Sequence, residues 1–506
     1  MNSSTPKARP ISANVLWNFG GQIAQALAAV VCLPFLVKYL GLPRMGLLSL
    51  IWVMVGYLSI LDLGLGQAVT KTVSEALAAN DPTRVARLYR TATRIQMLMG
   101  LSGALLLALG TNYLVTRALK VPLELQREAR ISLYMCALAF PSVLLASSAT
   151  GMLQAAQRFD VINMVQVPLG IAQFVLPLIC AAWSKDLSLV VAVLLASRIL
   201  AVVLLTVIVR RVIHIGDAGR AFWNAESREL ISFGGWITVS QAASPLMVYA
   251  DRFLVGALRS VSMVAYYAVP SDAILRFLIV PRSLVSALFP VLSATRDVSR
   301  AKELALRAVR YILLLVGLPA IILFVLAREI LTLWMGTDFA SHSALVLQIL
   351  LVGIVANCAA QVPYALIQAS GRADITAKLH LFEIPVYVCV GYFIIKAWGI
   401  QGAATLWSLR LVVETAILFE IARRRHAISW ADVVQQSLPQ IVLTLGLAGI
   451  AGFVLHSVLV VTADRWAAAL FLTSVLAATT WTFFLTIGER RRLLKVPRRR
   501  ISDRLP

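Results

Sequence analysis

Charge is scarce in this chain of 506 residues, of which only 14% are Asp, Glu, Lys or Arg. A soluble globular domain carries about 25% charged residues. Here 59% of the residues are hydrophobic, and the mean hydropathy is +0.83. The scarcity of charge excludes a water-soluble globular protein. The excess of apolar residues predicts an all-α integral membrane protein, because a helix satisfies its own backbone hydrogen bonds in lipid.

Cysteine and histidine are also few, with five residues of each type. The cysteines stand singly in apolar segments without Cys-x-x-Cys spacing, so we interpret them as small buried hydrophobic residues. The histidines are scattered one at a time, unlike the clustered ligands of a metal site. The sequence therefore predicts no disulfide framework, no bound metal and no cofactor.

Long polar segments and nucleotide-binding motifs are missing as well. The loops are too short for a soluble catalytic domain, and neither a Gly-x-x-x-x-Gly-Lys-Ser/Thr motif nor an Asp-x-Asp cluster occurs. These absences exclude an ATP-driven transporter in a single chain. They also weigh against a membrane-embedded glycosyltransferase or polymerase, so we expect no enzyme and no catalytic residues.

Apolar segments long enough to cross a bilayer recur along nearly the whole chain, since about 20 helical residues suffice. About fourteen transmembrane helices are predicted, at residues 13–37, 45–69, 92–116, 130–155, 161–183, 187–209, 230–256, 261–290, 306–332, 344–368, 375–397, 400–422, 437–461 and 466–487.

Basic residues dominate the charge, which is +22 net with a pI of about 10.4. In a membrane protein this excess belongs to cytoplasmic loops, so no nucleic-acid partner is inferred. A cytoplasmic N-terminus places most of the loop Lys and Arg residues inside. We therefore predict a multi-pass protein of the bacterial inner (plasma) membrane with both termini in the cytoplasm. The basic tail 489–506 is interpreted as an anchor attracted to anionic headgroups.

An internal repeat indicates how the spans are grouped. Gln154–Asp160 and Gln368–Asp374 both match Q-A-x-x-R-x-D, and Phe-Gly-Gly opens the first and seventh spans at the same offset. Each repeat contains six spans, an even number, so two parallel-related bundles are predicted. The predicted parts are a cytoplasmic N-terminus 1–12, an N-lobe 13–210, a cytoplasmic amphipathic linker 211–229, a C-lobe 230–425, two extra C-terminal helices in 434–488 and the tail 489–506.

Three short patterns resemble a known family. They are Asn18-Phe19-Gly20-Gly21, Leu61-Asp62-Leu63-Gly64-Leu65-Gly66 and Gly399-Ile400-Gln401-Gly402-Ala403-Ala404. With two six-helix bundles and two extra helices, the chain resembles the Wzx-type polysaccharide and oligosaccharide flippases. Their superfamily also contains multidrug-and-toxin extruders and lipid II flippases. The patterns consist largely of small residues, so they indicate the fold better than the substrate.

This resemblance implies a function in surface polysaccharide biosynthesis. The implied cargo is a polyprenyl-pyrophosphate-linked oligosaccharide, moved from the cytoplasmic to the outer leaflet by alternating access between the lobes. The implied partners are this lipid-linked sugar, membrane lipids and a polysaccharide polymerase or glycosyltransferases. The chain itself is expected to be a monomer.

Four arginines inside predicted spans are the candidate substrate-binding residues. A buried charge costs about 2.5–3.5 kcal/mol on insertion scales, so it persists beside a partner or a wet cavity. The planar donors of a guanidinium suit pyrophosphate oxygens. The four are Arg198, Arg276, Arg282 and Arg410. Arg198 has no carboxylate three or four positions away, which makes it the better ligand candidate; the alternative is a snorkelling or carbonyl-capping arginine.

The span at 261–290 is expected to border a polar cavity. Asp272 and Arg276 are four residues apart and share a helix face, which predicts either a ligand site or a structural ion pair. Arg282 can face the same cavity only if Pro281 bends the helix. Arg410 and Glu414 repeat the spacing of four.

Four carboxylates are the candidate residues for binding a coupling ion: Asp272, Glu383, Glu414 and Asp62. Burial favours reversible protonation of a carboxylate. Glu383 is interpreted as a lone carboxylate near Pro385, and for Asp62 a helix-terminal position near the outer interface is the alternative. A cation-coupled multidrug or solute exporter of the same fold therefore stays open, because four arginines and four carboxylates balance.

Overall fold

The computed structural model describes residues 11–58, 64–213, 247, 249–294, 297–370 and 372–426. In these residues the regular secondary structure is helical, with no β-strand, which confirms the predicted all-α class. Asp62, the last two predicted spans, the basic tail and most of the predicted linker lie outside the described residues.

Nine helices in the described residues are long and apolar enough to cross a membrane. Asp374–Arg425 covers two predicted spans, and Gly20–Met54 covers parts of the predicted spans 13–37 and 45–69. They contain Gly41 (φ 76°) and Gly399 (φ 62°), whose positive φ values interrupt the helix at little steric cost. The multi-pass membrane class is confirmed, whereas the total of fourteen stays a prediction.

The chain divides into two compact units. The first unit comprises Met1–Arg276 with Asp374–Leu406, and the second comprises Phe277–Ala373 with Trp407–Pro506. The grouping of spans into an N-lobe and a C-lobe stays a prediction.

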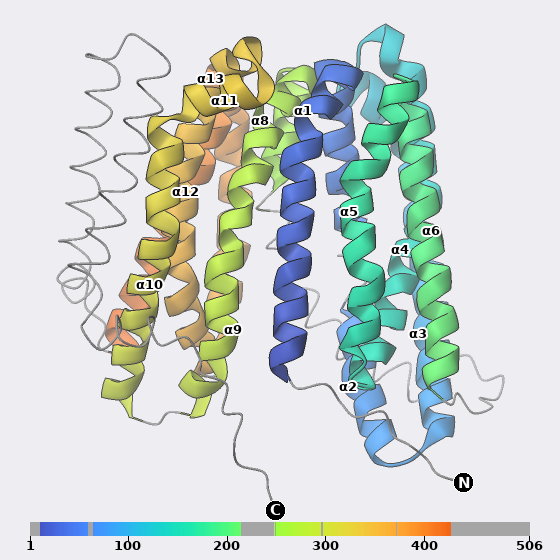
Figure 1. The fold of residues 1–506 in the computed structure, drawn as a ribbon, viewed down its shortest axis with the longest axis vertical. Helices are drawn as coiled ribbons and strands as arrows, with labels where there is room; N and C mark the ends of the chain where they lie inside the picture. Colours follow the sequence, from blue (N-terminus) through green and yellow to red (C-terminus); the bar gives the residue numbers. More distant parts are fainter. Residues whose placement is uncertain are drawn as a thin grey trace, which may run out of the picture. The chain divides into compact units, whose positions relative to one another are not determined.

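Seven labelled helices of the first unit are α1 (Ile11–Leu58), α2 (Leu65–Ala78), α3 (Pro82–Tyr113), α4 (Gln126–Ala155), α5 (Phe159–Trp183), α6 (Leu187–Val212) and α8 (Val261–Leu275). Short π and 3-10 segments, Leu114–Ala118 and Leu123–Leu125, join α3 to α4. Helix α4 packs against α2, α3 and α6, while α1 packs against α5 and α8 (Figure 1).

Small residues allow these helices to approach closely. A Cβ atom at Gly151 of α4 would lie 2.5 Å from the carbonyl oxygen of Gly66 on α2. A Cβ atom at Gly100 of α3 would lie 2.6 Å from the Cα atom of Pro141 on α4. Such contacts hold helices together in lipid, where no hydrophobic force drives one helix against another.

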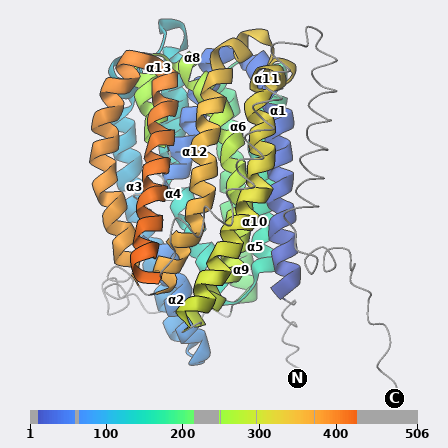
Figure 2. The ribbon, with the colours of Figure 1, turned by 90° about the vertical axis from the view of Figure 1, so that its left-hand side faces the viewer.

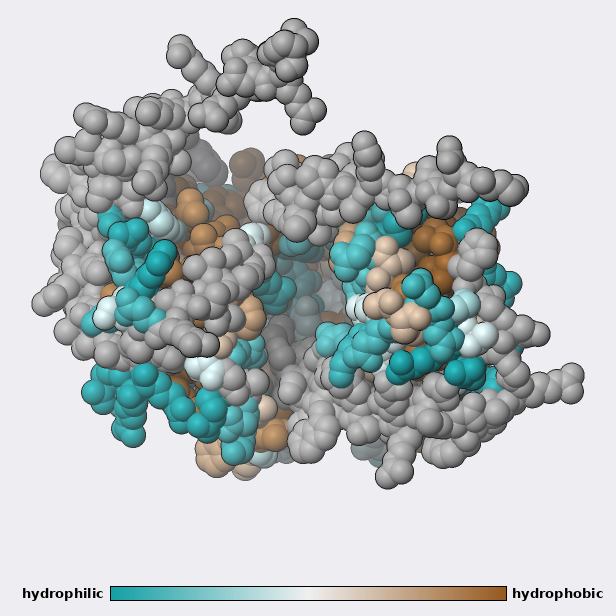
Figure 3. Space-filling view, turned by 90° about the horizontal axis from the view of Figure 1, so that it is seen from below, coloured by the Kyte–Doolittle hydropathy of each residue, from teal (hydrophilic) through white to brown (hydrophobic). Residues whose placement is uncertain are grey.

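The connection between α2 and α3 is polar and exposed. The Asp81 side chain caps α3 by accepting a hydrogen bond from the Arg84 amide at 2.9 Å. The Thr83 hydroxyl, and then this amide, lower the pKa of Asp81. In the view from this end of the molecule, hydrophilic residues gather on the described surface (Figure 3). This is the composition expected where helices leave a membrane.

The second unit contains α9 (Ile279–Ala294), α10 (Val298–Val325), α11 (Ala327–Met335) and α12 (Thr337–Ala369). Helix α12 packs against the other three (Figure 2). Helix α13 (Ala373–His426) passes from the first unit to the second. In the second unit the Ser408 hydroxyl of α13 donates to the Ile349 carbonyl of α12 at 2.7 Å.

The predicted span 261–290 is interrupted in its middle. Helix α8 ends at Leu275, a 3-10 turn covers Arg276–Leu278, and α9 begins at Ile279. Pro281 explains the interruption, because it lacks an N–H for the carbonyl of Phe277 and its ring crowds that carbonyl. The boundary between the units falls in this turn.

Candidate functional site

Arg198 lies in the middle of α6, twelve positions into an apolar helix that Asp186 caps. Its Nη2 atom donates to the Oε1 atom of Gln173 on α5 at 3.2 Å. In the part of the chain that the structure describes, no carboxylate pairs with it. Arg198 is therefore a half-buried cation with a neutral hydrogen-bonding partner.

A small apolar cavity of about 30 Å³ lies on one side of Arg198. Its walls come from α1, α4, α5 and α6, and its lining includes Ile51, Trp52, Cys136, Ala139, Leu194 and Leu195. The indole N–H of Trp52 is buried, with no hydrogen-bond partner among the described residues. A tryptophan N–H normally finds a partner when it is buried, so this donor is available to a ligand.

A larger polar cavity of about 440 Å³ also reaches Arg198, and its walls come from α2, α4, α5 and α6. The polar lining residues are Gln67, Ser147, Thr150, Gln154, Gln166 and Arg198. Arg198 and Leu169 line both cavities, so the two cavities adjoin at these residues. Among the described lining residues Arg198 carries the only charge.

Helical periodicity places the polar residues of α4 on one face. Ser147, Thr150, Gly151 and Gln154 follow the spacing i, i+3, i+4 and i+7, which repeats one side of an α-helix. The Thr70 hydroxyl of α2 donates to the Oε1 atom of Gln154 at 3.1 Å. The same hydroxyl lies 2.9 Å from the Gly66 carbonyl oxygen, so Thr70 holds the Gln154 amide beside α2 at the wall of the polar cavity.

Arg276 lies near the same part of α5. Its guanidinium carbon is 5.9 Å from the ring centroid of Phe174, which is 7% exposed and follows Gln173 directly. The Phe174 ring meets Trp52 edge to face, with centroids 5.4 Å apart. Two of the predicted substrate-binding arginines thus contact consecutive residues of α5, Arg198 through Gln173 and Arg276 through Phe174.

The expected pairing of Asp272 with Arg276 is wrong. The Oδ1 atom of Asp272 instead lies 2.6 Å from the Nη2 atom of Arg252, in the helical residues 249–258. Arg252 is 1% exposed and its guanidinium also lies 4.9 Å from the ring centroid of Tyr249. The tertiary partner outcompetes the local one because it neutralises a fully buried cation, whereas Arg276 finds an aromatic ring.

Asp251, beside Arg252, is a second buried charge that the sequence analysis overlooked. It is 1% exposed and accepts a hydrogen bond from the Tyr267 hydroxyl of α8. The Tyr387 hydroxyl of α13 lies 3.5 Å from the same oxygen. Both charged residues fall inside the predicted span 230–256, so a count of charges to the very end of that span would have found them.

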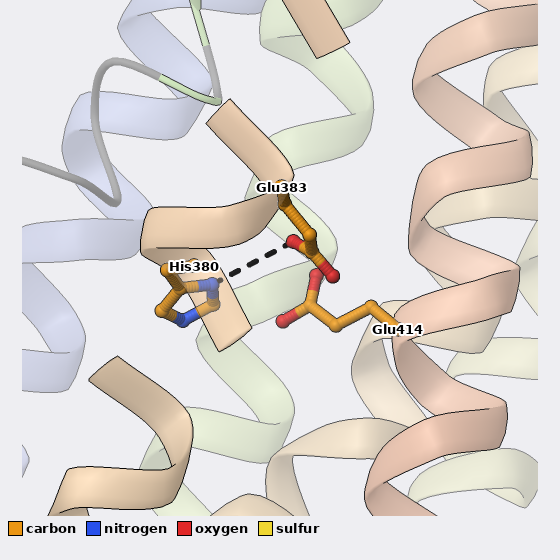
Figure 4. Close-up of side chains that lie close together, drawn as sticks. All are labelled: His380, Glu383 and Glu414. Carbon is orange, nitrogen blue, oxygen red and sulfur yellow. Dashed lines mark ion pairs between the residues drawn. The ribbon is translucent and has the colours of Figure 1, made fainter. Parts of the chain in front are cut away.

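Glu383 is not the lone carboxylate that the sequence suggested. Its Oε2 atom lies 3.7 Å from the Nδ1 atom of His380, one helical turn earlier on α13 (Figure 4). Glu414, also drawn in Figure 4, belongs to the second unit. There its Oε2 atom lies 3.4 Å from the Nη1 atom of Arg410, so the predicted pair of Arg410 and Glu414 forms.

The other predicted site residues give less information. Arg282 lies on α9 in the second unit, and its side chain is exposed. Asp62 lies outside the described residues, although Gly64, two positions later, lines the polar cavity.

The sequence matches the family model described as "Polysaccharide biosynthesis protein" over residues 11–296. It is also 30% identical over 406 residues to a Shigella flexneri protein named "Putative O-antigen transporter", covering 80% of this chain and 96% of that protein. A Bacillus subtilis protein named "Uncharacterized membrane protein EpsK" is 26% identical over 62% of this chain and 63% of its own length. The chain belongs to the polysaccharide biosynthesis protein family.

Solved transporters share the fold. The lipid II flippase MurJ, in an inward closed conformation, superposes with a TM-score of 0.73 at 10% identity, covering 96% of this chain and all of that one. A multidrug resistance MATE family transporter of the MOP superfamily, in an inward-facing conformation, gives a TM-score of 0.64 at 16% identity, covering 84% and 97%. The protein is thus a multi-pass membrane protein with a transporter fold.

Proposed function

We propose that this protein moves polyprenyl-pyrophosphate-linked oligosaccharides from the cytoplasmic to the outer leaflet of the bacterial inner membrane, for surface polysaccharide biosynthesis. Family membership and the likeness to the Shigella flexneri relative support this role. The observation that carries it is the position of Arg198, a cation without a carboxylate partner in the described residues, where an apolar and a polar cavity meet. The protein is a transporter and not an enzyme.

Arginine chemistry explains how the head group is held. The two phosphates present several oxygens, and a guanidinium donates charge-assisted hydrogen bonds to them in a planar fork. Arg198 lines both cavities and Arg276 contacts the next residue of α5, and we propose both as phosphate-binding residues. Arg282 and Arg410 are proposed as further phosphate contacts during transport. Among the four candidate carboxylates for the coupling ion, Glu383 and Asp62 are proposed for that role, and Asp272 and Glu414 for neutralising Arg252 and Arg410.

Translocation by alternating access follows from the cost of exposing a charged head group to lipid. The proposed N-lobe 13–210 and C-lobe 230–425 have the same orientation, with both chain termini in the cytoplasm. Rocking of one lobe against the other would open the head-group site first to the cytoplasm and then to the outside. The chain works as a monomer in this proposal, and a polysaccharide polymerase or glycosyltransferases use or supply its cargo.

The alternative is a cation-coupled exporter of drugs or other solutes on the same fold. A carrier of organic cations needs a cavity of negative potential, because a like charge in the wall repels the substrate. Among the described residues that line the two cavities, Arg198 is the charged one, and its charge is positive. This sign favours an anionic cargo.

The experiment uses the purified full chain in proteoliposomes. One set of vesicles contains lipid-linked oligosaccharides extracted from the cells that make this protein and carrying a fluorescent label on the glycan. A second set contains a cationic dye. We expect transfer of the glycan to the opposite leaflet, detected by an impermeant quencher, and no protein-dependent release of dye. Arg198→Gln should slow the transfer, and the exposed Arg117→Gln is the matched control. Dye release without glycan transfer would overturn the proposal.

A further inference from the structure

The two cavities that meet at Arg198 differ in chemistry. The apolar cavity is lined mainly by aliphatic residues and Trp52, and the polar cavity is lined by amides and hydroxyls of α2, α4 and α5. Hydrocarbon side chains therefore lie on one side of the Arg198 guanidinium, and uncharged hydrogen-bonding groups lie on the other side. A polyprenyl-pyrophosphate sugar has the same order of apolar chain, phosphates and hydroxyls.

Apart from Arg198, the polar lining residues of the polar cavity suit a ligand with many hydroxyl groups. Amide and hydroxyl side chains can both donate and accept hydrogen bonds, which is what a sugar hydroxyl requires. Three of them, Ser147, Thr150 and Gln154, form one stripe along α4, and Gln166 of α5 adds a second wall. The volume of about 440 Å³ lies within the roughly 300–1,000 Å³ of pockets for drug-sized ligands. The space therefore suits a small part of the glycan rather than a long sugar chain.

We infer that this polar cavity, inside the first unit and beside Arg198, binds the sugars nearest to the pyrophosphate. Gln166, Thr150 and Gln154 are then the residues that determine which sugars are accepted, and Arg198 holds a phosphate at the junction. The inference rests on the proposed function and deepens it, because it assigns the glycan a site within one unit.

Thiol protection tests where the sugar lies. Ser147→Cys places a thiol in the polar cavity of a chain whose five native cysteines have been replaced. A polar thiol reagent is then applied with one of two saturating probes, polyprenyl pyrophosphate without sugar or the lipid-linked oligosaccharides extracted from the source cells. We expect the sugar-bearing probe to slow labelling about tenfold and the sugar-free probe to slow it less than twofold. The exposed Asn112→Cys is the matched control and should react equally with both probes.

Affinity measurements on the full chain provide the second test. Thr150→Val and Gln166→Leu remove one hydrogen-bonding group each at similar volume, so each should weaken the sugar-bearing probe about threefold to tenfold and leave the sugar-free probe unchanged. Arg198→Gln should weaken both probes. The exposed Gln401→Leu should change neither.

The outcomes separate this inference from the proposed function. If both probes bind and the vesicles transfer glycan, but Ser147→Cys labels equally with either probe, the sugar site is elsewhere and the flippase proposal stands. If neither probe binds and no glycan is transferred, the proposed function itself fails. Equal weakening of both probes by Thr150→Val and Gln166→Leu would also overturn the sugar site.

Discussion

The Nη2 atom of Arg252 lies 2.6 Å from the Oδ1 atom of Asp272, and this ion pair joins the helical residues 249–258 to α8. The partners differ in burial, since the Arg252 side chain is 2% exposed and the Asp272 side chain is 27% exposed. Asp272 therefore neutralises the charge of an arginine that is almost completely buried. We regard the pair as structural, and its removal gives the first prediction.

Asp272→Asn should destabilise the protein by about 3–5 kcal/mol, because it leaves the buried Arg252 without its countercharge. The measurement is thermal unfolding of the purified protein in detergent, monitored by a thiol-independent probe such as intrinsic fluorescence. The double variant Arg252→Met with Asp272→Leu removes both charges and should recover most of the loss. If the double variant is less stable than Asp272→Asn, the pair is not what makes the single change costly.

Arg198→Ala and Arg276→Ala should each insert and fold normally but lower glycan transfer. A hydrogen bond to a charged group contributes about 1.5–3 kcal/mol, so each loss should weaken head-group binding by roughly one to two orders of magnitude. Phe174→Leu should have a smaller effect, because a cation–π contact contributes about 0.5–2 kcal/mol. Transfer rates in vesicles and membrane insertion are measured together. Full transfer by both alanine variants would show that the phosphate site is elsewhere.

Gly46→Ala should destabilise the contact between α1 and α8. A Cβ atom at this position would overlap the carbonyl oxygen of Val261, a backbone atom that cannot rotate away. Overpacking of this kind costs about 1–3 kcal/mol.

The matched control is Gly110→Ala on α3, where a Cβ atom would meet nothing within 4 Å. The control should be neutral or stabilising by up to about 1 kcal/mol, since alanine is the better helix former. Equal melting temperatures for the two variants would contradict the close approach of α1 and α8.

Glu383 and Glu414 should separate into a functional and a structural carboxylate. Glu414 accepts from Arg410 at 3.4 Å, and the two side chains are 8% and 9% exposed. Glu414→Gln should therefore lower the melting temperature. Glu383 lies 3.7 Å from His380 on its own helix, a partner that is charged only when protonated, and we propose Glu383 as a carrier of the coupling ion. Glu383→Gln should keep the melting temperature within a few degrees but remove the response of glycan transfer to an imposed proton or sodium gradient.

The control for this prediction is glycan transfer without a gradient. Glu383→Gln should transfer the glycan at a rate close to that of the unmodified protein when no gradient is imposed. An unchanged gradient response in Glu383→Gln would remove this residue from the coupling proposal. Loss of folding in Glu383→Gln, seen as a large fall in melting temperature, would assign it a structural role instead.

The sequence predicted the helical membrane fold well because that fold depends on composition and length alone. A bilayer core of about 30 Å needs about 20 apolar residues in any helix that crosses it, wherever that helix packs. The predicted spans at 161–183 and 187–209 accordingly coincide with α5 and α6 to within a few residues. The interruption near Pro281 was equally predictable, since the missing N–H acts on its own helical turn.

Charge partners were predicted correctly only where they lie on one helix. Arg410 and Glu414 pair as their spacing suggested, because four residues bring two side chains together on any α-helix. Asp272 has the same spacing to Arg276 and nevertheless pairs with Arg252. Spacing along a helix shows which charged side chains can form an ion pair. Burial decides which pair forms, because a buried charge without a partner is costly.

The amino-acid sequence by itself determined that this chain is helical, lies in a membrane and carries a few costly charges there, because transfer from water to lipid depends on each residue's own chemistry. Only the tertiary structure decided which of those charges are neutralised and which remain available. It brought Gln154, Gln166 and Arg198 from three helices to one cavity, an arrangement that depends on how α4, α5 and α6 pack rather than on any spacing along the chain.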